Sequence, residues 1–200
     1  MRSAEALSIF SLRLKEATST LHQELENLPV SKSILENTIS SHEYLRYLDR
    51  MHDVVCEIEN KLFPILQERG ILLQDRKKTK WIEKDFIELE YKKNRANEVF
   101  IELNEDISTG YALGILYVIE GSTLGGRIIS KHVQRTLGYT PDNGAAYFAG
   151  YGEDTGLFWK KFMTILGDFE KKNLAGDEII EGAKYAFKAI GNHFRLKTEA

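Results

Sequence analysis

Residues 114–129, GILYVIEGSTLGGRII, decide the fold. The segment is apolar and helical in character, yet it contains four glycines. A glycine inside a helix costs about 1 kcal/mol relative to alanine, so the four need a compensating role. Gly114, Gly121 and Gly125 lie within about 40° of one another on a helical wheel, which predicts a strip of bare backbone on one face. A packed neighbouring helix or a flat ligand would each use such a strip, and the spacing alone does not choose between them.

Two familiar glycine motifs do not fit this segment. A P-loop requires Gly-Lys followed by Ser or Thr, whereas Gly126 is followed by Arg127. A dinucleotide-binding fingerprint requires GxGxxG after a strand, and neither feature is present. The glycines therefore do not indicate a nucleotide site.

The rest of the chain also predicts helices, because it contains only three prolines and shows no strand alternation, repeat or linker. We expect one all-α domain over residues 1–200. The expected helices are residues 6–28, a helix opening at a capping box of Ser40 and Glu43, residues 77–91, one long bent helix or two helices within 106–137, a helix from a cap at Asp154 or Thr155 to Leu166, and residues 177–196.

Composition limits the function. With 42% hydrophobic and 10% aromatic residues the chain can bury a sizeable core, and a net charge of −3 gives no general attraction to nucleic acid or to an anionic membrane. The single cysteine, Cys56, excludes an internal disulfide. Residues 1–7 lack the apolar run of a signal peptide, and no stretch approaches the roughly 18 apolar residues of a membrane span. We expect a cytoplasmic protein with no nucleic-acid or membrane partner.

The five histidines do not form a recognisable metal motif. No HExxH is present, and Asp49-x-x-His52 has the wrong acid for a ferritin-like di-iron site and no second copy. His22 differs from the others because it lies at the edge of the apolar stripe of the first helix. Lys15 precedes it by seven residues on nearly the same face, about 10 Å away along the axis. A neutral imidazole is a good iron ligand. The spacing between Lys15 and His22 fits an ordinary surface histidine equally well.

Three segments together resemble the heme oxygenase family. Residues 14–22, LKEATSTLH, resemble its proximal helix, in which a Lys-Glu-Ala-Thr run precedes the histidine that ligates iron. Residues 116–126, LYVIEGSTLGG, look like the distal helix of bacterial members and are similar to the enzymes that make biliverdin for bacteriophytochromes. Residues 148–156, FAGYGEDTG, followed by Trp159, match the same subgroup. The segments lie in matching order across about 150 residues.

The resemblance implies a helical fold with heme between the first helix and the glycine-rich distal helix. His22 would be the iron ligand, Gly121 and Gly125 would lie against the porphyrin, and Tyr117 would line the same site. Lys15 matches a lysine that contacts a heme propionate. Lys160 is a looser match to a second basic contact, and a solvated lysine is the slightly favoured interpretation there.

One position departs from the animal-type pattern. Those members carry an aspartate directly after the first distal glycine, where it organises water, and Ser122 stands at that position here. The catalytic residues implied by the resemblance are then Gly121, Ser122 and Gly125. Proton delivery is left open among Ser122, a water chain and backbone carbonyls.

The implied activity is cleavage of heme, as both cofactor and substrate, by O2 to biliverdin, carbon monoxide and ferrous iron. Because the chain has no flavin or nicotinamide motif, electrons would come from an external donor of the ferredoxin or reductase type. Two alternatives remain at this point. One is a heme-binding or storage protein on the same scaffold, and the other is a helical interaction module that uses the glycine strip for a partner helix.

Overall fold

A computed structural model describes residues 2–196, with side chains from residue 9 onward. About 74% of the chain is helical, and the described residues contain no strand, which confirms the all-α class. The elements are α1 (Arg2–Glu26), α2 (Pro29–Ser33), α3 (Ser41–Glu57), the π-turn η1 (Ile58–Leu62), α4 (Phe63–Glu68), the 3-10 turn η2 (Gln74–Arg76), α5 (Thr79–Glu88), α6 (Thr109–Leu137), α7 (Ala146–Ala149), the 3-10 turn η3 (Gly152–Asp154), α8 (Thr155–Asn173) and α9 (Gly176–Arg195).

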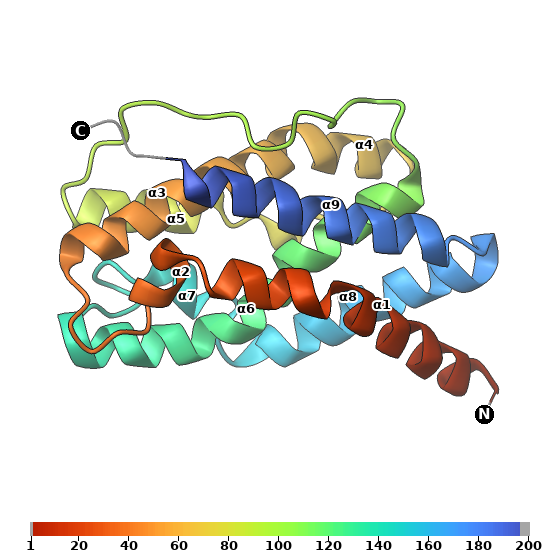
Figure 1. Cartoon of the computed structure of the whole chain (residues 1–200), viewed down its shortest axis with the longest axis horizontal. Coiled ribbons are helices and arrows are strands. Elements are labelled where there is room, and N and C mark those ends of the chain that lie inside the picture. The colour runs from red at the N-terminus through yellow and green to blue at the C-terminus, as the bar shows by residue number, and fades with distance from the viewer. Residues whose placement is uncertain (1, 197–200) are drawn as a thin grey trace.

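Helix α9 is the element on which the candidate site is built. Both α6 and α1 pack against it, and α8 packs against α6. Figure 1 shows α1 (red) and α6 (green) crossing the molecule in the same direction, from right to left. Although they share α9 as a neighbour, α1 and α6 scarcely contact each other. Their facing surfaces are therefore mostly free of helix–helix packing.

The predicted elements are largely confirmed. Ser40 and Glu43 form both arms of the expected capping box at the start of α3. The region from 106 to 137 holds one helix, α6, which ends at Gly138 in the left-handed conformation. The helix α8 begins after the expected cap residue, Asp154, although that side chain makes no capping bond. One expectation was wrong in detail: α8 continues to Asn173 rather than Leu166.

The glycine strip has two different uses along α6. A Cβ built on Gly114 would overlap the backbone carbonyl of Ile179 in α9, and a Cβ on Gly182 of α9 would overlap the carbonyl of Tyr111. Gly114 therefore serves the close crossing of two helices. A Cβ on Gly125 would meet nothing within 4 Å. The predicted strip thus packs against a neighbouring helix at Gly114, which is one of the two alternatives, and only its later part is open.

This contrast predicts opposite effects of the same substitution. Gly114→Ala should destabilise the protein by roughly 1–3 kcal/mol or more, because the new methyl group collides with backbone atoms of α9. Gly125→Ala should stabilise it by up to about 1 kcal/mol, because alanine favours the helix and the site is open. Urea denaturation of the two variants measures whether the free energy of unfolding falls for Gly114→Ala and rises for Gly125→Ala. A stabilised Gly114→Ala protein would contradict the close crossing of α6 and α9.

Acidic side chains of α3 hold the long irregular segment 89–108, which runs across the molecule in Figure 1. Asp49, Asp53 and Glu57 are spaced four residues apart and share one face of α3. Lys93 bridges Asp49 and Asp53 at 2.9 and 3.0 Å, and the Glu57 carboxylate accepts from the backbone N–H of Val99 at 2.6 Å. These bonds satisfy polar backbone that would otherwise be unpaired.

Asp53 is the buried centre of this network. Its Oδ2 lies 3.2 Å from Nε2 of His193 in α9, and it also accepts from the backbone N–H of Asn97. Burial alone would raise its pKa, but hydrogen bonds from His193, Asn97 and Lys93 outweigh burial and lower the pKa to about 2. The ionised carboxylate therefore ties α3 to α9 and to the segment that crosses them.

The lowered pKa predicts a pH dependence of stability. A carboxyl group with a depressed folded pKa stabilises the fold above its unfolded pKa, near 4, and loses that contribution as the pH falls toward 2. We expect Asp53→Asn to lower the free energy of unfolding at pH 7 by about 3 kcal/mol, as for a broken buried ion pair. The free energy of unfolding of the variant should also fall less between pH 4 and pH 2 than that of the unaltered protein. An unchanged acid limb in a denaturation series would contradict this assignment.

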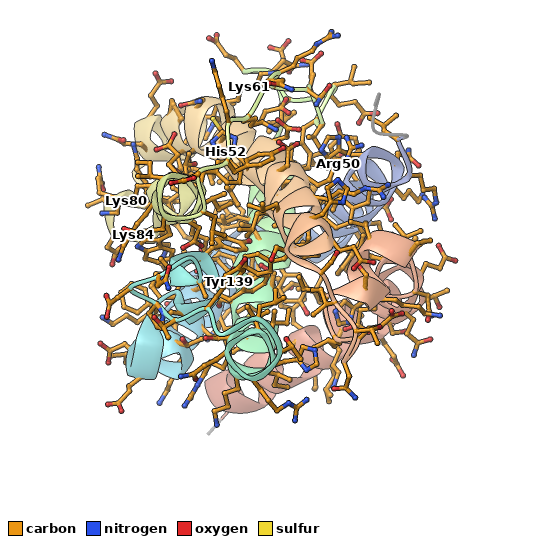
Figure 2. The ribbon with its side chains drawn as sticks, turned by 90° about the vertical axis from the view of Figure 1, so that its left-hand side faces the viewer. Arg50, His52, Lys61, Lys80, Lys84 and Tyr139 are labelled. Atoms are coloured by element: carbon orange, nitrogen blue, oxygen red, sulfur yellow. The ribbon has the colours of Figure 1, made fainter. Side chains whose placement is uncertain are left out.

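The distribution of charge agrees with a compact helical core. Lys80 and Lys84 of α5 lie at the surface in Figure 2, whereas Arg50 lies between α3 and α9 and donates to the carbonyl of Leu196 at 2.8 Å.

Helix α6 is long and apolar enough to cross a membrane by length and composition alone. Half of its most apolar window is buried inside the protein, as expected for a core helix.

Candidate functional site

One contact fixes how α1 and α6 face each other. The hydroxyl of Tyr117 in α6 lies near the hydroxyl of Thr18 in α1, and Thr18 itself donates to the carbonyl of Leu14 at 2.9 Å. Because the two helices run in the same direction (Figure 1), we expect His22, one turn further along α1, to lie at the level of Gly121, one turn further along α6. The contact therefore sets the register between the predicted iron ligand and the predicted distal glycines.

The imidazole of His22 is accessible. Its side chain is 57% exposed, its Nε2 lies 3.4 Å from Oε1 of Glu26, and its ring centroid lies 5.6 Å from that of Phe187 in α9. Glu26 is itself 66% exposed, so this pair is weak and is easily given up. Phe187 provides a fixed apolar surface beside the ring. The histidine is thus free to take another partner.

The opposite side of the site is bare backbone. A Cβ on Gly125 would meet nothing, and a Cβ on Gly121 would meet only the Trp159 ring at 3.7 Å. The neighbouring apolar side chains Leu124 and Ile128 are 43% and 68% exposed. Exposed apolar side chains beside open backbone favour a flat, largely apolar ligand lying on this face. Gly126 is different, because its Cβ would press on the carbonyl of Phe148 at 3.0 Å.

Two aromatic residues of the site were missed as site residues by the sequence reasoning. Trp159 of α8 lies against Tyr117, with ring centroids 5.6 Å apart, and flanks Gly121. Phe187 had been expected only as an inward residue of the last helix, yet it also contacts His22. The segment ending at Trp159 had carried part of the family resemblance, which was the available signal for that residue. Phe187 gave no such signal.

Ser122 borders the face of the open glycines, about 60° around α6 from Gly125 and about 100° from Gly121. It is exposed, and its hydroxyl donates to the carbonyl of Ile119 at 2.8 Å. With Thr123, Gly126 and Ile129 it lines a small cavity that is closed by residues of α3, α5 and α7. Ser122 therefore does not extend the bare surface but borders a polar space next to it.

A buried charge cluster anchors α6 just before Gly121. Glu120 is 1% exposed and accepts from both Arg76, at 2.5 Å, and Lys78, also at 2.5 Å. Lys78 also donates to the carbonyl of Arg76 and to the hydroxyl of Tyr151, each at 2.9 Å. Burial lowers the pKa of Lys78, while the charge of Glu120 opposes that change. Because all three ammonium protons have acceptors, we assign Lys78 as a fixed cation that positions the helix.

The two lysines of the prediction are both solvated. Lys15 on α1 and Lys160 on α8 are exposed. Among the described residues, neither lysine forms a hydrogen bond or ion pair with another predicted site residue. Their role as propionate contacts therefore stays a prediction.

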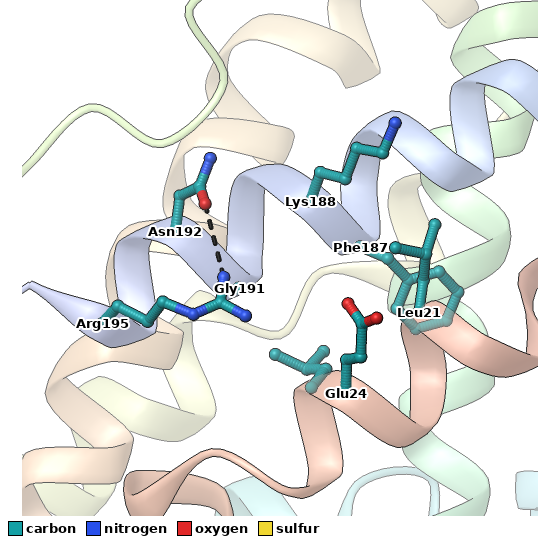
Figure 3. A pocket seen from close by; sticks show the side chains of 8 residues that line it. Leu21, Glu24, Phe187, Lys188, Gly191, Asn192 and Arg195 are labelled. Carbon is teal, nitrogen blue, oxygen red and sulfur yellow. Dashed lines mark hydrogen bonds between the residues drawn. The ribbon is translucent and has the colours of Figure 1, made fainter.

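No group of three or more metal-binding side chains occurs among residues 9–196. A groove of about 190 Å³ lies between α1 and α9 and is lined by Leu21, Glu24, Phe187 and Arg195 among others (Figure 3). His22 and the distal glycines are not part of its lining. Because sites for drug-sized ligands measure roughly 300–1,000 Å³, this groove is too small for a macrocycle. The exposed histidine and the bare face of α6 are the better candidate.

The fold and these residues define a class: an all-helical protein with an exposed histidine on α1 and a bare stretch of backbone on α6, a combination that suits a flat ligand whose metal needs one protein ligand. The family can be named from comparison with known proteins. The heme oxygenase family model matches residues 8–195, and the chain belongs to that family. A search of curated proteins found no match.

Solved structures of heme oxygenases share the fold. The enzyme from Neisseria meningitidis, determined with NO and CO bound, is 25% identical with a TM-score of 0.70, covering 96% of this chain and 94% of that one. The Leptospira interrogans enzyme is 17% identical, with a TM-score of 0.73 and coverage of 92% and 98%. Heme oxygenase-1 of the cyanobacterium Synechocystis, in complex with heme, is 19% identical, with a TM-score of 0.67 and coverage of 92% and 90%.

Proposed function

We propose that this protein binds heme between His22 and the face of Gly121 and Gly125, and cleaves it with O2 and external electrons to biliverdin, carbon monoxide and ferrous iron. Membership of the heme oxygenase family supports the proposal. The observations that support it are the exposed imidazole one turn beyond Thr18 on α1 and, on the neighbouring helix α6, the open space that an added Cβ would find at Gly125.

His22 would supply the single protein ligand. A neutral imidazole donates a lone pair to iron, and the weak pair with Glu26 leaves the nitrogen available. Phe187 limits how far the ring can swing, since their centroids are 5.6 Å apart. The side chain would therefore bind the iron from a restricted set of orientations.

Gly121 and Gly125 would let the backbone of α6 lie close over the other face of the ring. Trp159 and Tyr117 would close one end of that face and exclude bulk water from it. Lys15 and Lys160 have exposed ammonium groups that would pair with the carboxylates of the ligand. Heme, when bound, supplies the O2-binding iron and the ring carbon that is oxidised.

The sequence has no flavin or nicotinamide motif, so a reductase or ferredoxin-type partner would deliver electrons. We propose that the enzyme works in the cytoplasm. Ser122, in place of an acid, is the one feature that would favour a heme-storage protein instead.

A direct experiment separates these functions. The purified protein is mixed with hemin and ascorbate in air, and the visible spectrum is recorded over time. We expect a Soret band that decays while a biliverdin absorption grows. A Soret band that persists would indicate storage, and its absence would indicate that the glycine face binds a protein partner rather than heme.

A further inference from the structure

The α1–α9 groove is a second concave site, separate from the proposed heme face. It measures about 190 Å³, and neither His22 nor the open glycines line it. An engineered cavity of about 150 Å³ with an apolar lining binds benzene. The α1–α9 groove therefore has room for a ligand that consists of one small ring and a short polar arm.

One side of this groove is apolar. Leu21 and Leu25 of α1 and Phe187 of α9 line it, and all three pack on the main core. They therefore present a fixed surface to a ligand. An aromatic ring would bind there because it removes apolar area from water and can pack against the ring of Phe187.

The charged groups of the groove stand on opposite walls. Glu24 belongs to α1, whereas Lys188 and Arg195 belong to α9, and Figure 3 shows the carboxylate of Glu24 turned toward α9. Among the described residues, neither Glu24 nor Lys188 forms a hydrogen bond or an ion pair. Both groups can therefore pair with a ligand that carries the opposite charge.

Arg195 is placed to receive a carboxylate. Its Nη1 donates to Oδ1 of Asn192 at 3.4 Å, and the same atom lies 3.3 Å from the position of a Cβ built on Gly191. The guanidinium group thus lies over the bare backbone of Gly191, inside the groove (Figure 3). Because most of its five N–H groups remain unused, it can bind a carboxylate through two parallel hydrogen bonds.

Phe187 connects the groove with the imidazole of His22. Its ring lines the groove, and its centroid lies 5.6 Å from that of the His22 ring. A ligand ring that packs against Phe187 would restrict its motion and, by direct contact, the orientation of the imidazole. Occupation of the groove therefore acts on the residue that we propose as the iron ligand.

We infer that the α1–α9 groove is a regulatory site for a small aromatic α-amino acid. The carboxylate of the ligand pairs with Arg195 and Lys188, and its ammonium group pairs with Glu24. Its ring packs on Phe187 and so holds His22 in place. A ligand with only one of the two charges would leave a charged group of the groove without a partner, which favours the zwitterion. The effect on heme rests on the proposed function, whereas binding in the groove does not.

The first test titrates heme-free protein with L-phenylalanine, followed by calorimetry and by NMR of the histidine rings. We expect one saturable site with a Kd of about 0.1–1 mM. The ring signals of His22 should shift at saturation, whereas those of His42, near the start of α3, should not. Phenylpropionate lacks the ammonium group and phenethylamine lacks the carboxylate, so each should bind about tenfold more weakly.

The second test removes the charges with Arg195→Gln and Glu24→Gln. The matched control is Glu16→Gln, which neutralises another exposed acid of α1 outside the groove. All three side chains are exposed, so the variants should fold normally. Affinity for L-phenylalanine should fall about tenfold or more in the two test variants and stay unchanged in the control. Saturating L-phenylalanine should raise the hemin affinity of the unaltered protein about fivefold, and Arg195→Gln should lose this effect.

Absence of saturable binding, or equal binding by the two test variants and the control, would overturn the inference and leave the proposed function standing. His22 signals that stay unchanged at saturation would overturn the regulatory role. A protein that binds L-phenylalanine as expected but forms no Soret band with hemin would overturn the proposed function alone.

Discussion

His22→Ala is expected to abolish the histidine-ligated heme spectrum and reduce biliverdin formation to background. We propose the accessible imidazole on α1 as the iron ligand, and the described residues offer no cluster of metal-binding side chains to replace it. Because the side chain is 57% exposed, its removal should leave the thermal stability of the heme-free protein nearly unchanged. Hemin titration followed by visible spectroscopy measures the effect.

The matched control is His42→Ala, which removes another exposed imidazole, near the start of α3. It should bind and degrade heme as the unaltered protein does. Added imidazole should restore part of the ligated spectrum of His22→Ala by occupying the vacated position. If His22→Ala retained a normal spectrum and normal turnover, the ligand assignment would be wrong.

Gly125→Leu is expected to block heme binding while stabilising the heme-free protein. No atom lies within 4 Å of the position of the new Cβ, so the leucine side chain fits the free structure without a clash. Leucine also has a helix propensity about 1 kcal/mol better than that of glycine. The same side chain would occupy the space that the porphyrin needs. We therefore expect hemin affinity to fall by about 100-fold or more, as for a steric block costing roughly 3 kcal/mol.

Gln134→Leu supplies the control for this substitution. It places the same side chain at an exposed position of α6 that lies about 180° around the helix from Gly125. Heme affinity should be unaffected there. Unaltered affinity in Gly125→Leu would instead show that the porphyrin does not approach this face.

Much of this arrangement could be predicted from local sequence signals. Proline scarcity, apolar spacing and the Ser40–Glu43 capping box act over a few residues, so they located the helices well. The glycine strip was harder, since bare backbone serves helix packing and ligand contact equally. Only the crossing partner distinguishes them: Gly114 meets the backbone of α9, whereas Gly125 meets nothing. That partner lies about 65 residues later in the chain and leaves no trace near Gly114.

The polar surroundings of α6 could not be predicted for a similar reason. Glu120 had no apparent role in sequence, but it is buried between Arg76 and Lys78, which arrive from a short turn some 40 residues earlier. Tyr147 and Ser122 line the same cavity, and Asp85 fixes the beginning of α7 that carries Tyr147 there. Such clusters depend on the packing of several elements, whereas periodicity describes one element at a time.

A crystal structure of the protein with bound hemin is the most direct test of where the porphyrin lies. The account predicts iron ligated by the imidazole of residue 22, with the backbone of Gly121 and Gly125 across the other face of the ring. Iron held by any other side chain, or a porphyrin seated in the α1–α9 groove away from α6, would contradict it.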